Sequence, residues 1–138
     1  MKKVLLYVWQ LPQHLLGLLL IWLLKAKKKG WPLCYWQFTP KGRFSRFISG
    51  ASLGEYIILP PRSDYAQTVL HEYGHSLQSR RWGPLYLLAV GLPSAIGNLW
   101  DRLAHKKWPA EKRVKWYYSR WPEKQADRFG GITRAWEG

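Results

Sequence analysis

Residues 71–75 read HEYGH, and the interpretation of the whole chain starts from this stretch. In a helix, residues i and i+4 are neighbours, so His71 and His75 would lie one turn apart on the same face. Two imidazoles in this arrangement can bind one zinc ion. Glu72 lies next to them in sequence and can take a proton from a water molecule that the metal activates. The spacing therefore predicts a metal site on one helix.

The flanking residues favour a helix around this stretch. Apolar residues recur at helical spacing and would form its buried face: Val69, Leu70, Tyr73 and Leu77. Ser63 or Asp64 can cap its N-terminus with a side-chain oxygen, and Gly83-Pro84 would end it. Gly74 inside the helix costs about 1 kcal/mol relative to alanine. Two explanations for Gly74 stay open, the close approach of a strand or substrate and a contact with a second helix.

A third ligand is expected in the segment 121–131, which reads WPEKQADRFGG. Pro122 fits the first turn of a helix, and Gly130-Gly131 would end it. Glu123 and Asp127 would then share one face, with Glu123 as the third ligand and Asp127 accepting a hydrogen bond from a ligand histidine. A solvated helix face is the alternative interpretation. Because the chain has only eight acidic residues, the pair favours the ligand interpretation.

The two motifs, HExxH at residues 71–75 and ExxAD at residues 123–127, resemble those of gluzincin-type zinc metallopeptidases. The chain is especially similar to minigluzincins, which are minimal single-domain zincins, and to the ExxAD form of HtpX-like membrane metallopeptidases. The resemblance implies a Zn²⁺ cofactor with the following ligands: His71, His75 and Glu123. It also implies that Glu72 is the general base and that Asp127 orients a ligand.

The function implied by this resemblance is the hydrolysis of peptide bonds in a peptide or protein substrate by a zinc-activated water. The oxyanion would also need a hydrogen-bond donor, and the candidates by position are Tyr117, Tyr118 and His105. The alternative is a non-catalytic, zinc-containing, membrane-associated scaffold or binding protein. Structural zinc sites usually have four ligands rich in cysteine, and this chain has only Cys34, so an open catalytic geometry is favoured.

Length and cysteine content predict one small domain. The chain of 138 residues can form one modest core. The single cysteine, Cys34, excludes an intramolecular disulfide and is compatible with a reducing compartment, in keeping with a cytoplasmic active site. Neither His14 nor His105 is expected to be a ligand, because each lies at the edge of an apolar segment, where a polar interface role is favoured.

The net charge of +14 favours an anionic partner, either a membrane surface or nucleic acid. Lysine, arginine and tryptophan residues bracket two apolar stretches, as is typical of segments at a membrane–water interface. We therefore expect the protein to be membrane-associated. Nucleic acid is not an expected partner, because the charges cluster at the edges of these stretches instead of forming one continuous stripe.

The first apolar stretch, Val4–Leu24, would be long enough to cross a bilayer if it were one helix. Gln10, Pro12, Gln13 and His14 interrupt it, so a helix lying in the interface or packed on the domain is an open alternative. We expect residues 1–30 to form this membrane-associated helix and residues 31–138 to form the catalytic domain. The second stretch, Pro84–Leu99, is shorter and is predicted to be a kinked core helix.

The segment 31–60 has a different pattern, with short aromatic and β-branched runs separated by turn residues. It predicts two or three antiparallel strands, at residues 33–38, 43–48 and 56–59. By resemblance to zincins, the strand 53–59 would be the sheet edge that binds the substrate backbone. A structural strand that covers the HExxH helix is the open alternative. The expected fold is therefore α+β: a minimal zincin-like fold with a small antiparallel sheet packed on the HExxH helix, further helices and an N-terminal apolar helix.

Overall fold

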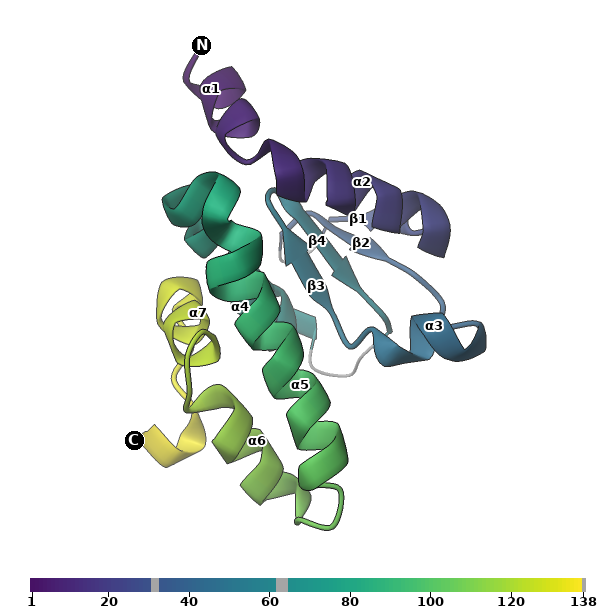
Figure 1. Cartoon of the computed structure of the whole chain (residues 1–138), viewed down its shortest axis with the longest axis vertical. Helices are drawn as coiled ribbons and strands as arrows, with labels where there is room; N and C mark the ends of the chain where they lie inside the picture. The colour runs from purple at the N-terminus through teal and green to yellow at the C-terminus, as the bar shows by residue number, and fades with distance from the viewer. Residues whose placement is uncertain (31–32, 62–64, 138) are drawn as a thin grey trace.

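The computed structural model describes residues 1–30, 33–61 and 65–137, which form a mixed α+β fold (Figure 1). These ranges contain the α-helices α1 (Lys2–Trp9), α2 (Leu11–Leu24), α3 (Gly42–Phe47), α4 (Tyr65–Trp82), α5 (Leu92–Ala104), α6 (Ala110–Tyr118) and α7 (Glu123–Gly130). The strands are β1 (Lys27–Lys29), β2 (Tyr35–Gln37), β3 (Ala51–Leu53) and β4 (Tyr56–Leu59). Short turns of other helix types are η1 (Gly83–Leu85), η2 (Leu87–Gly91) and η3 (Ala135–Glu137). The α+β class expected from the sequence is confirmed.

The four strands form one mixed sheet in the order β1-β2-β4-β3. β1 is antiparallel to β2 and β3 is antiparallel to β4, whereas β2 and β4 are parallel. The prediction of an antiparallel sheet is therefore wrong for the central pair. The hairpin turn at Gly54, whose φ is +67°, reverses the chain after β3, so that β4 returns in the direction of β2.

The interior strand β4 is an apolar run that is buried from both sides. Ile57 belongs to a cluster with Val69 of α4, and Ile58 belongs to a cluster that includes Leu20 of α2. A strand covered on both faces needs apolar residues at every position, because successive side chains point to opposite faces. The prediction that residues 53–59 form the sheet edge is wrong for β4, which is interior; Leu53 ends β3, which like β1 is an edge strand.

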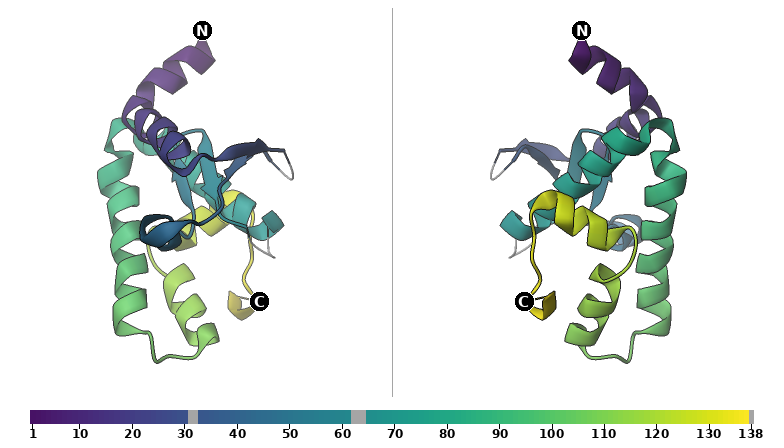
Figure 2. Two further views of the ribbon diagram at one scale, coloured as in Figure 1. Left: turned by 90° about the vertical axis from the view of Figure 1, so that its right-hand side faces the viewer. Right: turned by 90° about the vertical axis from the view of Figure 1, so that its left-hand side faces the viewer.

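The molecule is layered, with α2 on one face of the sheet and α4 on the other. α7 packs against the far side of α4, so that α4 lies between the sheet and α7 (Figures 1 and 2). The HExxH helix is therefore the central element of the fold.

Two elements between residues 25 and 50 differ from the expectation. Residues 43–48 were predicted to be a strand, but the structure has the short helix α3 there. Phe44, Phe47 and Ile48 also fit i, i+3, i+4 spacing, so their pattern is ambiguous between strand and helix. The edge strand β1 consists of three exposed lysines, which a search for apolar alternation does not detect.

The first apolar stretch is broken at Gln10 into α1 and α2. In the described ranges no single helix has both the length and the apolar character to cross a membrane, and α1 and α2 pass this test only as a pair bent by 78°. The apolar residues Leu20, Ile21 and Leu24 of α2 pack on the sheet core. α2 therefore shares a core with the sheet.

The apolar segment after α4 is helical, as predicted, but only part of it is core. α4 ends at Trp82, and Gly83 adopts a φ of +53°. The chain then continues through η1 and η2 into α5. Val90 and Tyr86 are buried, but one long face of the segment is exposed. Ser63 and Asp64, expected to cap α4, lie outside the described residues.

Glycines allow α4 and α7 to approach closely. A Cβ on Gly74 would overlap the backbone carbonyl of Ala126, and a Cβ on Gly130 would overlap the carbonyl of Leu70. Glycine permits such contact because it has no side chain. Of the two explanations left open for Gly74, the helix–helix contact is therefore the one found. The contact places the beginning of α7 beside the histidine face of α4.

We expect Gly74→Ala to lower the free energy of unfolding by about 1–3 kcal/mol, because the new methyl group must push α7 away from α4. Chemical denaturation followed by circular dichroism measures this change. Gly30→Ala is the matched control, since a Cβ at that position meets no atom within 4 Å. A Gly74→Ala protein as stable as the Gly30→Ala protein would contradict the proposed packing constraint.

Candidate metal centre

Three buried side chains converge between α4 and α7. Glu123 Oε2 lies 3.0 Å from His71 Nε2 and 3.1 Å from His75 Nε2. One ligand atom from each of these residues can be chosen so that all three lie within 4.8 Å of one another. His71 and His75 are one turn apart on α4, and Glu123 is the first residue of α7. The three residues predicted as ligands are therefore brought together.

His71 is oriented by a carboxylate that is itself held in place. Its Nδ1 donates to Asp127 Oδ1 at 2.7 Å. Arg134 donates to both oxygens of Asp127, at 2.7 and 2.8 Å. This bidentate pair fixes the carboxylate, which in turn fixes the imidazole with Nε2 toward Glu123. Asp127 therefore occupies the orienting position predicted for it.

His75 is oriented by an amide in the same manner. Its Nδ1 donates to Gln78 Oε1 at 2.7 Å. The Gln78 amide nitrogen donates to the Pro122 carbonyl at 3.0 Å and to Gln125 Oε1 at 3.1 Å. These contacts fix the amide oxygen toward the histidine, so the Nδ1 hydrogen is directed away from the site and Nε2 is directed into it.

Glu123 has its two carboxylate oxygens in different environments. Oε2 faces the two histidines, while Oε1 accepts hydrogen bonds from Ser94 Oγ at 2.5 Å and from the Tyr117 hydroxyl at 3.1 Å. Burial opposes ionisation, but the two histidines more than offset it and hold the pKa of Glu123 well below its usual range. The carboxylate is therefore a charged group with one oxygen directed at the imidazoles.

The metal-free centre is arranged to hold positive charge. Burial disfavours a charged imidazole, but hydrogen bonds to Asp127 and Glu123 dominate and raise the pKa of His71 to about 9. A proton on His71 Nε2 points at the same carboxylate oxygen that would join the imidazoles in binding a metal ion. Two imidazole nitrogens and one carboxylate oxygen are a donor set that suits a divalent metal. The buried group can therefore hold a metal ion in place of a proton.

The centre forms part of the wall of a cleft of about 690 Å³. His71, Glu72 and His75 line it together with the edge strand β3. Glu72 is buried, and its Oε1 lies 3.0 Å from the position that a Cβ on Gly50 would occupy. The predicted general base therefore lies in the cleft, between the histidines and the backbone that leads into β3.

The three candidate oxyanion donors from the sequence differ in their position relative to the cleft. Tyr117 and Tyr118 line the cleft, and the ring of Tyr118 packs edge-on against His71. His105 lies outside the lining, stacked on Trp108 and bonded to Asp101.

His14 is buried, and it contacts α1 and the turn between β3 and β4. It accepts a hydrogen bond from the Glu55 backbone N–H and contacts the Tyr7 carbonyl. As expected, His14 and His105 are not part of the ligand group. Both are, however, buried instead of lying at an exposed interface.

Apart from Asp127, several side chains that orient the ligands or their partners were not identified from the sequence. Ser94, Gln78 and Arg134 come from three different elements or loops, and each contacts a different ligand or its partner. Of these three residues, only Gln78 could have been predicted from the sequence. It lies three residues after His75, and residues i and i+3 of a helix are neighbours on one face.

No protein-family model matches the chain, and comparison with curated proteins and with solved structures finds no significant match.

We expect the wild-type protein to bind about one divalent ion per chain and Glu123→Ala to lose most of it, because two histidines alone are an incomplete ligand set. Elemental analysis of purified protein after zinc reconstitution measures the ratio. Glu111→Ala, an exposed glutamate of α6, is the matched control and should bind as wild type does. Equal metal content in Glu123→Ala and wild type would exclude Glu123 as a ligand.

Metal affinity should also depend on pH. Because the pKa of His71 is about 9 in the metal-free protein, an ion must displace its proton at neutral pH. The apparent affinity should rise by roughly tenfold per pH unit below that pKa and level off above it. Competition with a chromophoric chelator over this range measures the slope. Asp127→Asn removes a carboxylate that raises this pKa, so its plateau should begin at lower pH; a flat profile in the wild type would contradict the assignment.

Proposed function

We propose that this protein is a zinc-dependent metallopeptidase that hydrolyses peptide bonds. The observation that carries the proposal is the convergence of His71 and His75 with the buried Glu123, beside a cleft that the two histidines line together with Glu72. A purely structural metal site needs neither a cleft nor an additional carboxylate beside the ligands. The combination of three ligands, one base and an accessible cleft is what metal-assisted hydrolysis requires.

Zinc is the metal that fits this donor set best. Two imidazoles and one carboxylate are three protein ligands, a number typical of catalytic zinc sites, in which a further position stays open. When bound, zinc would act as a Lewis acid and lower the pKa of a water molecule toward about 7. Ser94 and Tyr117 bind Glu123 Oε1, which favours binding of the metal through Oε2 alone.

Glu72 is the proposed general base. It is adjacent to the ligand His71 in sequence, and both line the cleft. From this position its carboxylate would take a proton from the attacking water and then deliver that proton to the leaving amine. Gly50 lies against the carboxylate, and the absence of a side chain there leaves room for it.

The proposed substrate is an extended peptide or a protein segment. β3 is hydrogen-bonded to β4 on one side only in the described sheet, and its residues 51–53 line the cleft. An extended chain can add to such an edge through backbone hydrogen bonds. The Tyr86 hydroxyl already donates to the Ser52 carbonyl at 2.7 Å, so that carbonyl has a partner within the protein. The contact holds the edge strand against the segment that leads into α5.

We expect Glu72→Gln to keep its metal and to lose peptide cleavage by about 100-fold or more, because an amide cannot accept the proton from water. A fluorogenic peptide library, screened first with the zinc-loaded wild type, provides the substrate for the comparison. Glu111→Gln changes an exposed glutamate outside the cleft and should retain full activity.

An equally active Glu72→Gln protein would exclude the proposed mechanism. Tightly held zinc without cleavage of any peptide in a broad library would instead support the non-catalytic scaffold considered from the sequence.

A further inference from the structure

Exposed apolar side chains are concentrated on four segments. Among the described residues, all large exposed apolar side chains except Met1, Trp82, Val114 and Trp121 belong to α1, α2, α3 or residues 83–104. α2, α3 and α5 lie on the side of the molecule that faces the viewer in Figure 1, which is the left side of the left view in Figure 2. α1 precedes α2 in the chain and joins its N-terminal end. We call the exposed surface of these four segments the apolar side.

The segment 83–104 contributes an uninterrupted apolar stripe. Its members follow one another at intervals of three or four residues, and each is more than half exposed: Leu85, Leu88, Leu92, Ile96, Leu99 and Leu103. A helix of a water-soluble domain normally turns such a stripe toward a core. Here the core side of the helix is a different face, where Val90 and Gly97 are buried. The stripe is therefore a second apolar face that the fold of this chain leaves uncovered.

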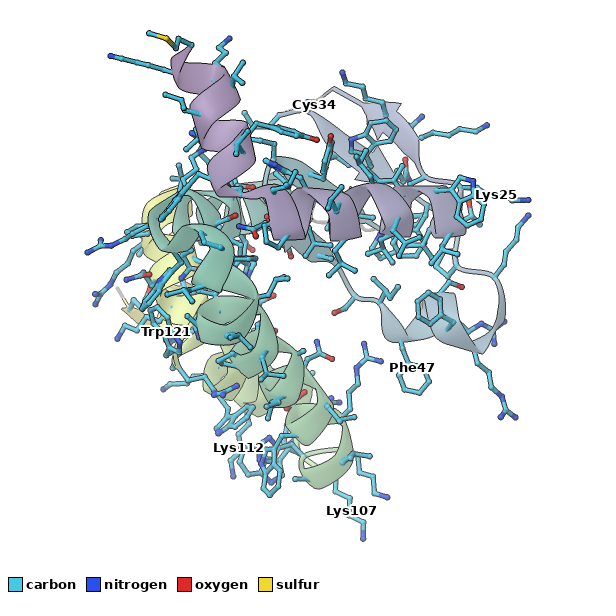
Figure 3. All side chains as sticks on the ribbon, turned by 45° about the horizontal axis from the view of Figure 1, so that its top comes forward. Lys25, Cys34, Phe47, Lys107, Lys112 and Trp121 are labelled. Atoms are coloured by element: carbon cyan, nitrogen blue, oxygen red, sulfur yellow. The ribbon has the colours of Figure 1, made fainter. Side chains whose placement is uncertain are left out.

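The charges around the apolar side are almost entirely positive. The four segments contain one acidic residue, Asp101, and Arg113 binds it at 2.7 Å. Exposed basic side chains flank the apolar stretches: Lys2, Lys3, Lys25, Lys27, Lys28, Lys29, Arg43, Arg46, Lys106 and Lys107. Figure 3 shows Lys25 at the end of α2 and Lys107 beyond the end of α5. This surface therefore complements an anionic partner.

We propose that the apolar side docks onto an anionic lipid bilayer, with the stripe and the outer face of α2 at the boundary between headgroups and acyl chains. Trp22 and Trp100 are 73 % and 58 % exposed, and tryptophan favours this boundary. The lysines and arginines at the segment ends would contact anionic headgroups. Positive charge around the patch opposes its use between two copies of a chain with a net charge of +14.

The cleft opens beside this surface. Leu20 of α2, Phe47 of α3 and Leu99 of the stripe all line it. Phe47 projects from α3, and the Arg102 guanidinium of α5 lies 5.8 Å from its ring centroid (Figure 3). Docking would bring the cleft to the lipid surface. The substrates would then be polypeptide segments that are anchored in or adsorbed to the bilayer. This assignment rests on the proposed peptidase function.

Docking can be tested without catalysis, using the full-length Glu72→Gln protein and flotation with vesicles of phosphatidylglycerol or phosphatidylcholine. We expect flotation with the anionic vesicles. The combined change Leu88→Ser, Ile96→Ser and Leu103→Ser should weaken binding by about 100-fold or more, because three exposed apolar anchors are lost. None of these three residues lines the cleft. Circular dichroism checks that the variant is folded.

Charge reversal provides a matched pair of variants. Lys106→Glu with Lys107→Glu, next to the stripe, should weaken binding by about tenfold or more. Lys124→Glu with Arg128→Glu makes the same change in net charge on α7, outside the four segments, and should have a much smaller effect. The proposal would be overturned if the protein with the unchanged surface failed to bind vesicles, or if the two charge-reversed pairs had equal effects. It would also be overturned if the stripe formed a dimer in place of binding vesicles.

The substrate class needs a second experiment with the active protein. A peptide that the wild type cleaves is compared with the same peptide carrying an acyl chain on anionic vesicles. The anchored peptide should be cleaved faster, and the triple serine variant should lose this gain while cleaving the free peptide normally. Equal rates for both peptides would overturn the substrate assignment. Absence of any cleavage would contradict the peptidase function instead, and the flotation result would be unaffected.

Discussion

The close contact between α4 and α7 is the constraint on which the rest of the structure depends. The two motifs are far apart in the chain, and the packing of α7 on α4, with Gly74 against the Ala126 backbone and Gly130 against Leu70, brings Glu123 to the histidine face. Because the contact is made by backbone atoms, side-chain adjustment cannot relieve an added methyl group. The absence of a side chain at Gly74 therefore helps to set the position of Glu123.

Around this contact, each ligand side chain is held by hydrogen bonds on the side away from the centre. Arg134 acts through Asp127 on His71, Gln78 acts on His75, and Ser94 with Tyr117 acts on Glu123. Buried polar networks of this kind are costly when incomplete, so their members specify one arrangement of the interior. In the metal-free centre, a proton on His71, whose pKa is raised to about 9, compensates part of the negative charge of Asp127 and Glu123. The fold thus prepares the donor atoms before any ion arrives.

The parts that the sequence predicted well are those in which local spacing decides the outcome. The helices around residues 71–75 and 123–127 follow from i, i+4 spacing and terminal glycines, and their shared faces follow from the same geometry. The sheet was harder to predict. The parallel pairing of β2 with β4 depends on contacts between distant segments, and residues 43–48 fit both periods. The contact of Ser94 with Glu123 could not be inferred from the sequence, because the two residues belong to different helices, α5 and α7, and meet only in the folded chain.

The distance along the chain between the ligands also determines when the centre can exist. His75 and Glu123 are separated by 48 positions, and His71 and Asp127 by 56. During synthesis, a ribosome-bound chain that has released α4 but not α7 has two histidines and no complete ligand set. The centre is therefore completed only after the sheet, α5 and α6 have emerged. The donor set is thus assembled only when α7, the last α-helix among the described residues, packs onto α4.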